Sequence, residues 1–143
     1  MFSKTFGYAL RATVYVTVHG SIDKKVGLQE ISDGLGIPHY FLGKIMQDLV
    51  RHGIFDSTKG PSGGFFPNEH TADTPLTNIL KITDGNLVFD QCALGIKRCN
   101  ADHPCPLHDD FAACRNEMIH SLSTKTVQTL AEEVTAGRSF LVR

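Results

Sequence analysis

The chain has 143 residues, 41% of them hydrophobic and 20% charged, and its formal net charge is −1. This length makes one domain, or a small domain with an appended arm, and it can bury a true core without disulfide bonds, so intrinsic disorder is excluded. Apolar runs are too short for a membrane span, and Lys4 and Arg11 interrupt the N-terminal segment. We therefore expect no signal peptide, no membrane partner and a cytoplasmic location.

Charge is spread evenly along the chain. Residues 1–72 carry 7 basic and 6 acidic side chains, and residues 73–143 carry 7 basic and 9 acidic ones. Neither half is a general polyanion binder, so any DNA binding must depend on where individual Lys and Arg side chains lie and on dimerisation.

The first part of the chain predicts a helix-turn-helix. Apolar residues spaced by four predict a helix over 3–19, with Ser3 as its N-cap and Gly20 at its end. A short helix follows and closes in the glycine-rich turn 34–36. Pro38 opens a third helix that Gly53 closes. Two short helices joined by a tight glycine turn are typical of this DNA-binding unit.

A β-hairpin is predicted directly after these helices. Residues 54–58 read as a strand, 60–64 as a turn, and 65–66 as the start of the returning strand, which Pro67 ends. A helix-turn-helix followed by such a hairpin is a winged helix. Thr74 as N-cap and Pro75 at the first helical position predict a fourth helix, which reaches Gly85 and completes this core.

The remainder of the chain has a different character. Residues 90–106 show no periodicity and hold three of the four cysteines, which predicts an irregular loop. A long helix over 107–122 carries a heptad-like apolar stripe suited to a partner helix, made by Leu107, Phe111, Cys114, Met118 and Leu122. A short helix capped by Thr126 and a tail after Gly137 follow.

The predicted fold is therefore mainly α with a small β-wing. We divide the chain into a winged-helix DNA-binding domain (1–86), a cysteine-rich loop (87–106) and a C-terminal part with the dimerisation helix, short helix and tail (107–143).

The third helix is the candidate recognition helix, because its apolar side chains occupy one face and leave the other free for the major groove. The candidate DNA-binding residues are His39, Tyr40, Gly43 and Lys44 on this helix and Ser57, Thr58, Lys59 and Gly60 in the wing. Gln47 ranks lower because it lies a turn further from the helix start. Taken singly, a Lys or a Tyr on a helix surface is more often a solvated residue than a DNA contact, and some winged helices bind proteins rather than DNA.

The cysteine-rich loop predicts a metal centre. Cys92, Cys99 and Cys105, with His108 just beyond, offer three thiolates and an imidazole, a donor set that suits an iron-sulfur cluster or zinc. The wide cysteine spacing favours a cluster, while structural zinc sites prefer close ligand pairs. As the fourth ligand we favour His108 over Cys114, which falls in the apolar stripe, and over His103.

Several motifs together give the chain a family resemblance. These are residues 6–12, the pair Gly36 and Ile37, the wing residues 59–65 and the segment 105–108. They resemble the Rrf2 family of winged-helix transcription regulators, in its IscR- and NsrR-like members. The resemblance implies a homodimer whose long C-terminal helices cross, and a loop that binds an iron-sulfur cluster.

By the same resemblance Cys92, Cys99, Cys105 and His108 match cluster ligands of the family. Three departures stand out: Gly7 replaces an acidic ligand of some relatives, Lys59 replaces the usual wing arginine, and Gly43 and Lys44 replace an acidic residue and a glutamine. The changed recognition helix leaves the operator sequence open, and Lys59 replaces a bidentate contact with a point charge.

We therefore expect a dimeric repressor that binds a double-stranded DNA operator and senses redox state, nitric oxide or iron-sulfur status through its cluster. The sequence leaves [2Fe–2S] and [4Fe–4S] open. The alternative is a winged-helix regulator with structural zinc or no metal, whose DNA binding does not switch. An enzyme is not expected, because the chain has no Gly-rich phosphate loop and no paired catalytic carboxylates.

Overall fold

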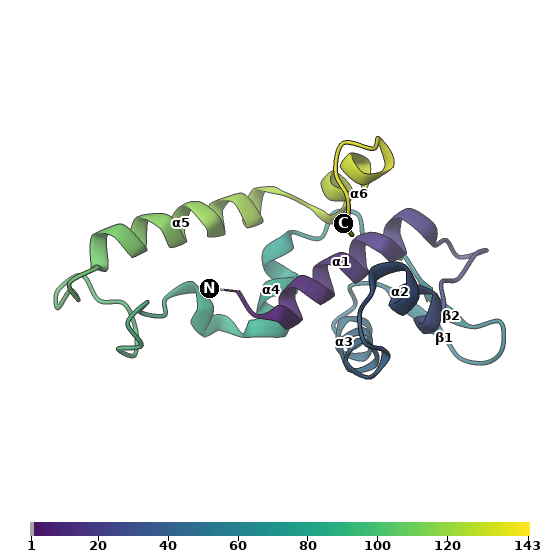
Figure 1. Cartoon of the computed structure of the whole chain (residues 1–143), viewed down its shortest axis with the longest axis horizontal. Helices are drawn as coiled ribbons and strands as arrows, with labels where there is room; N and C mark the ends of the chain where they lie inside the picture. Colours follow the sequence, from purple (N-terminus) through teal and green to yellow (C-terminus); the bar gives the residue numbers. More distant parts are fainter. Residues whose placement is uncertain (1) are drawn as a thin grey trace.

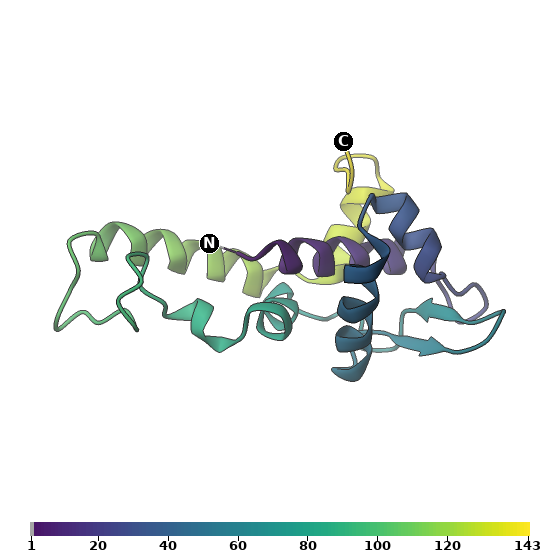
Figure 2. The same cartoon turned by 60° about the horizontal axis from the view of Figure 1, so that its bottom comes forward.

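The computed structural model describes residues 2–143 as a globular body with a projecting arm (Figure 1). The helices and strands are α1 (Lys4–His19), α2 (Leu28–Leu35), α3 (His39–Arg51), β1 (Asp56–Thr58), β2 (Gly64–Phe66), α4 (Leu76–Asp84), the 3-10 helix η1 (Asn86–Phe89), α5 (His108–Thr124) and α6 (Val127–Thr135). Helices α1 to α4 and α6 form the body, and α5 with the loop before it forms the arm in both ribbon views (Figures 1 and 2). The predicted class, mainly α with a small two-stranded sheet, is confirmed.

The body is built around the helix-turn-helix. Ser3 caps α1 as predicted, since its Oγ accepts a hydrogen bond from the Phe6 N–H at 3.0 Å. Helix α2 ends at Gly36, whose φ of +61° is a left-handed conformation that favours glycine. The apolar faces of α1 to α4 meet in one core, whose largest fully buried side chains are Phe55, Ile31, Ile37, Leu42, Met46, Leu49, Leu76, Ile79 and Leu80.

The wing is a short antiparallel hairpin in which Asp56 pairs with Phe66 and Thr58 with Gly64. Its β2 strand is held to the body by Val26, whose N–H and carbonyl each form a 2.8 Å hydrogen bond with Phe65. Gly64 lies so close to this segment that a Cβ there would be 2.7 Å from the Val26 carbonyl oxygen, so only glycine allows the approach.

The strand predicted over 54–58 starts later than expected. The Ile54 N–H donates to the carbonyl of Leu49 in the last turn of α3 at 3.0 Å, so it is not free to pair with another strand. Ile54 and Phe55 are buried in the core rather than paired in the sheet, and the strand begins only at Asp56. Hydrophobicity in this segment therefore marks core packing and not strand length.

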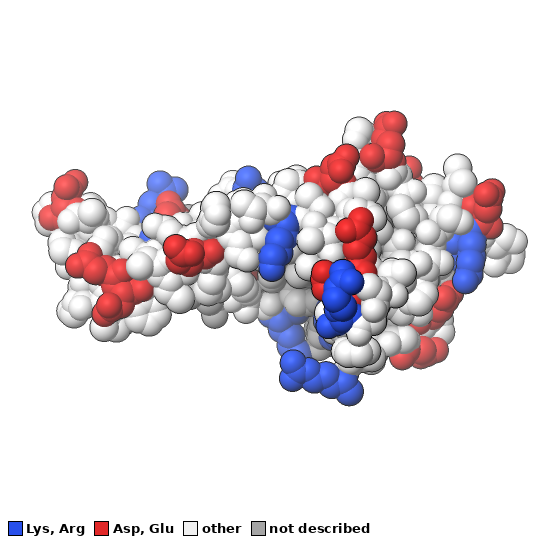
Figure 3. All heavy atoms as spheres, turned by 90° about the horizontal axis from the view of Figure 1, so that it is seen from above, with Lys and Arg blue, Asp and Glu red and all other residues white. Residues whose placement is uncertain are grey.

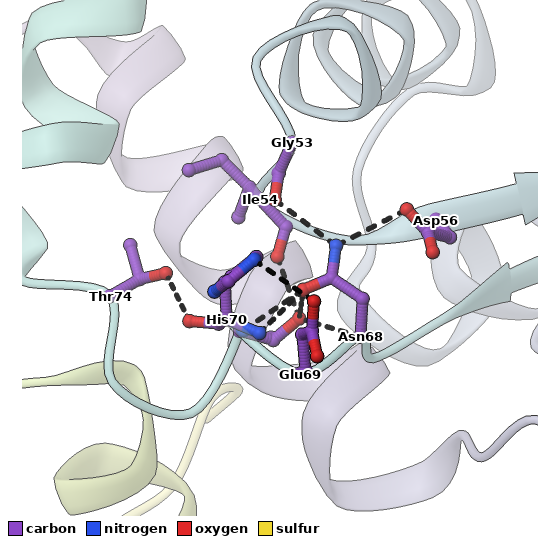
Figure 4. Close-up of polar contacts among 8 residues, drawn as sticks. Gly53, Ile54, Asp56, Asn68, Glu69, His70 and Thr74 are labelled. Atoms are coloured by element: carbon purple, nitrogen blue, oxygen red, sulfur yellow. Dashed lines mark hydrogen bonds and ion pairs between the residues drawn. The ribbon is translucent and has the colours of Figure 1, made fainter.

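A polar corner joins the end of α3, the start of the wing and the segment leading to α4 (Figure 4). The Asn68 Nδ2 donates to the Gly53 carbonyl at 3.1 Å and to Asp56 Oδ1 at 3.2 Å, while its Oδ1 accepts from the His70 N–H at 2.8 Å and the Thr71 N–H at 3.1 Å. The Thr71 hydroxyl in turn donates to the Ile54 carbonyl at 2.7 Å. Asn68 thus uses both its donor and its acceptor groups to fix the wing to the body.

The predicted start of the fourth helix was wrong by one residue. Pro75, not Thr74, is the N-cap of α4, and the Thr74 hydroxyl instead donates to the His70 carbonyl at 2.9 Å. The reason is a tertiary contact. The backbone carbonyl of Thr74 accepts from the Val127 N–H at 3.0 Å, and the Leu76 N–H donates to the Lys125 carbonyl at 3.1 Å. These bonds tie the start of α4 to the junction between α5 and α6.

Helix α6 lies beside α1 rather than with the arm (Figure 1). Thr126 caps it in a capping box with Thr129, as predicted for the N-cap, and Val127 and Ala131 are buried in the body. The C-terminal part defined from the sequence as 107–143 therefore contains a projecting helix and a helix that packs into the N-terminal core. No helix within residues 2–143 combines the length and apolarity that crossing a bilayer requires.

Candidate functional site

The candidate recognition helix α3 presents its predicted DNA-binding residues outward. His39, Tyr40 and Lys44 are exposed, while Leu42 and the other apolar residues of the opposite face are buried. Lys44 lines a groove between α1 and α3. Gly43 is half-buried beside Leu28 of α2, and a Cβ there would be 3.6 Å from the Leu28 side chain, an ordinary contact distance.

The candidate wing residues are exposed as well. Ser57 and Thr58 lie on β1, and Lys59 and Gly60 begin the turn that follows it. Figure 2 shows this hairpin projecting from the body beside α3. A recognition helix and a projecting hairpin on one body are the two elements with which winged helices contact a duplex.

The surface charge is mixed. On the face shown in Figure 3, acidic and basic side chains are interspersed and neither kind forms a continuous patch. This agrees with the net charge of −1 and limits non-specific attraction to DNA. Binding would then depend on a few positioned cations such as Lys44 and Lys59.

The four candidate metal ligands come together at the tip of the arm. Cys92, Cys99 and Cys105 lie on the loop, and His108 is the first residue of α5; all four line one cavity of about 210 Å³. They form two pairs, with the Cys92 Sγ 3.7 Å from the Cys105 Sγ and the Cys99 Sγ 3.2 Å from the His108 Nδ1. Three soft thiols and one imidazole around one cavity fit an iron-sulfur cluster chemically.

The loop is shaped by its own backbone. Cys92 and Lys97 close a turn through a 3.3 Å hydrogen bond from the Cys92 N–H to the Lys97 carbonyl, and the Cys99 N–H donates to the Asp90 carbonyl at 2.7 Å. Hydrogen bonds from the backbone at Leu94 and Ile96 hold the pKa of the buried Cys92 thiol below its ordinary value. A lowered pKa favours the thiolate, which is the form that binds metals.

The two other candidate fourth ligands, Cys114 and His103, take no part in the donor pairs. Cys114 is exposed on α5, where its Sγ contacts the Met118 sulfur at 4.0 Å, and it does not line the donor cavity. His103 lines the cavity, but within the described residues 2–143 its ring forms no hydrogen bond with a cysteine. Within residues 2–143 no three cysteine, histidine or carboxylate side chains group tightly enough for a single metal ion.

Two residues important to these sites were missed from the sequence. Asn68 has no motif, and only the structure shows that it joins the wing to the body. Arg115 donates from Nη1 to the Gln91 carbonyl at 3.1 Å and lines a cavity beside Cys92. The sequence does offer one indication for Arg115, since it is the only Lys or Arg between residues 108 and 124.

A helix-turn-helix with an attached hairpin and a projecting helix defines the class of winged-helix proteins. Comparison with known proteins makes this more specific. The Rrf2 family model, described as an iron-dependent transcriptional regulator, matches residues 2–133. The chain belongs to the Rrf2 family.

Individual relatives agree with this assignment. A putative HTH-type transcriptional regulator of Aquifex aeolicus is 29% identical over 132 residues, covering 91% of this chain and 90% of the relative. The HTH-type transcriptional regulator NsrR of Geobacillus kaustophilus is 24% identical over 137 residues, covering 94% and 91%. The structure of CymR, the global cysteine regulator of B. subtilis, superposes with a TM-score of 0.74 at 15% identity over 92% of this chain and 96% of CymR. These proteins are transcription regulators and not enzymes.

Proposed function

We propose that this transcription regulator is a dimeric repressor whose affinity for its operator depends on an iron-sulfur cluster held by Cys92, Cys99, Cys105 and His108. The observation that carries the proposal is the meeting of four soft donors from two segments around one cavity. The family description as iron-dependent supports it. When bound, the cluster would supply sensitivity to oxidants, nitric oxide or iron supply.

The pairing of the donors favours a two-iron cluster. Two protein ligands of one tetrahedral metal lie about 3.3 to 3.8 Å apart, given metal–ligand bonds of about 2.0 to 2.3 Å. The distance of 3.7 Å between the Cys92 and Cys105 sulfurs falls in this range, and the Cys99–His108 pair at 3.2 Å is close to it. A [2Fe–2S] cluster takes two protein ligands per iron, whereas four ligands on [4Fe–4S] are shared one per iron.

Structural zinc is the alternative. It needs its four ligands around one ion, and the described residues offer two pairs rather than such a group. A regulator without any metal at this position is the further alternative. Metal and sulfide analysis separates these possibilities.

The dimer is expected to form through α5. No residue of α5 is buried, and Leu107 and Phe111 of its apolar stripe are each 38% exposed. A second copy packing against this stripe would cover it and place two recognition helices about 34 Å apart, one turn of the duplex. Met118→Asp should give a monomer in sedimentation velocity, whereas Asn116→Asp, two positions along the same helix and therefore on another face, should remain a dimer.

The arm connects the donor cavity to the DNA-binding body. His108 starts α5, and Lys125 and Thr126 at its other end pair with Leu76 and Pro75 at the start of α4. Helix α4 packs against α1 and α3. A change in how the loop contacts His108 can therefore alter the orientation of α5 in the dimer, and with it the spacing of the two recognition helices. A shift of a few kcal/mol between two arrangements suffices to switch occupancy.

The direct test is purification of the full chain without oxygen, followed by an absorption spectrum and iron and sulfide analysis. We expect brown protein with about two irons and two sulfides per chain. Stoichiometric zinc, or colourless protein without iron, would overturn the cluster assignment.

A further inference from the structure

Arg115 lies in the middle of α5 and reaches back to the cysteine-rich loop. Its Nη1 donates to the carbonyl of Gln91 at 3.1 Å, and Gln91 directly precedes the candidate ligand Cys92. This hydrogen bond joins the loop to α5 about two turns beyond His108, at a point separate from the donor pairs.

The guanidinium also lies beside the donor set. Arg115, Phe111, Val88 and Cys92 line a cavity of about 380 Å³ between the loop and α5. Cys92 lines this cavity and the donor cavity, so its side chain lies between the two. The Arg115 Nε is buried without a hydrogen-bond partner among residues 2–143. Part of its charge therefore has no local acceptor.

The second arginine beside the thiols, Arg98, is already paired. Arg98 lines the donor cavity, and its Nε lies 3.4 Å from Asp90 Oδ2. Arg115 forms no ion pair with any carboxylate in the described part of the chain. Of the two guanidiniums beside the thiols, only that of Arg115 has a charge with no carboxylate to balance it.

A cluster held by these ligands would leave a negative charge to compensate. Three thiolates outnumber the two positive charges of an oxidised [2Fe–2S] core, and reduction by one electron adds a further negative charge. A partly buried negative charge is stabilised by a nearby unpaired cation, and the stabilisation grows with each added electron.

Resting on the proposed function, we infer that Arg115 is a positioning residue for the cluster: it fixes Gln91 and Cys92 against α5, and its charge favours the reduced cluster. Because Arg115 belongs to the arm helix, the residue that adjusts the redox state is also part of the helix that would carry the signal.

The test compares Arg115→Met, which removes charge and hydrogen bond but keeps the apolar stem, with Arg115→Lys, which keeps the charge. Lys125→Gln is the matched control, since it removes an exposed cation at the far end of α5. Each full-length protein is purified without oxygen, and its midpoint potential is measured spectroscopically with dithionite supplying the one electron that each cluster takes up.

We expect the equilibrium constant for one-electron reduction to fall about tenfold in Arg115→Met, which is a shift of about 59 mV to more negative potential. Arg115→Lys should recover most of this shift, and Lys125→Gln should match the wild type. An unchanged potential in Arg115→Met, or an equal shift in Arg115→Lys, would overturn the inference.

A second measurement covers a variant that loads no cluster. In the metal-free proteins, hydrogen–deuterium exchange of the amides in residues 90–99 should be several-fold faster in Arg115→Met than in the wild type or Lys125→Gln, because the hydrogen bond from Arg115 to the Gln91 carbonyl is lost. Unchanged exchange would refute the positioning role. If the wild type itself holds no iron and sulfide, the proposed function fails and this inference with it. If the wild type holds the cluster and Arg115→Met has the same midpoint potential and the same exchange rates, the proposed function stands and the inference alone fails.

Discussion

The Sγ of Cys99 lies 3.2 Å from the Nδ1 of His108, so that a loop thiol and the first side chain of α5 meet directly. This contact joins the two segments whose relative position would change when a cluster is gained or lost. It also supports the proposal of His108 as the fourth ligand, since Cys114 lies exposed further along α5.

His108→Ala should therefore lose the cluster or hold it with much lower occupancy, because one iron would keep only Cys99 as a protein ligand. Cys114→Ala is the matched control and should retain full iron and sulfide content. Absorption spectra and metal analysis of protein purified without oxygen measure both. Full occupancy in His108→Ala, or loss in Cys114→Ala, would move the fourth ligand away from His108.

Lys44→Ala and Lys59→Ala should each weaken operator binding and reduce the slope of log affinity against log salt by about 0.9, the value for one phosphate contact on B-DNA. Lys125→Ala removes an exposed cation from the arm and should leave the slope unchanged. The measurement is fluorescence anisotropy on a duplex selected by the wild-type protein from a random library. An unaltered slope in both wing and helix variants would show that the DNA face lies elsewhere.

Asn68→Asp should impair DNA binding although Asn68 itself is not expected to contact DNA. The substitution replaces the Nδ2 donor with an acceptor facing the Gly53 carbonyl and the Asp56 carboxylate, which are held at 3.1 and 3.2 Å (Figure 4). Loss of these bonds costs about 1 to 3 kcal/mol of unfolding free energy and releases the wing. We expect weaker operator binding with a shallower salt slope. Glu69→Gln, a neighbouring exposed change, should bind normally.

Acid should remove a stabilising link between the start of α1 and the end of α4. Burial raises the pKa of Asp84, but hydrogen bonds from the Ser3 hydroxyl and N–H outweigh it and keep this pKa below its ordinary value. A carboxylate with a lowered pKa stabilises the fold above its unfolded pKa, near 3.9, and this contribution is lost as the pH falls through the folded pKa.

Asp84→Asn should accordingly be less stable than the wild type at neutral pH, by less than about 1 kcal/mol because the carboxylate is largely exposed. The difference should shrink as the pH falls below about 4. Urea unfolding at several pH values measures it, and a difference that stays constant down to pH 2 would contradict the role of the carboxylate.

Local signals were sufficient to predict much of the body. The Ser3 cap, the glycine turn at Gly36 and the apolar face of α3 are properties of short segments, and the structure confirms them. The errors arose where a hydrogen bond to a neighbouring element takes a backbone group that the expected element would have used. Leu49 takes the Ile54 N–H and shortens β1, and the α5–α6 junction pairs with Thr74 and shifts the start of α4.

At the candidate sites, too, local features could be predicted and contacts between segments could not. Donor chemistry and spacing along the loop were visible in the sequence, but the division into a Cys92–Cys105 pair and a Cys99–His108 pair depends on how the loop folds back on itself. Arg115 and Asn68 each donate a hydrogen bond to a backbone carbonyl far along the chain, and no spacing rule predicts such contacts.

The most direct test of the account is operator affinity measured on one anaerobic preparation before and after its iron is removed by a chelator, beside the variant with Cys92, Cys99 and Cys105 all changed to Ala. The account predicts that iron removal changes the wild-type dissociation constant at least about tenfold, a coupling of about 1.4 kcal/mol, and leaves the variant unaffected. Equal affinity of the iron-loaded and iron-free wild type would contradict it.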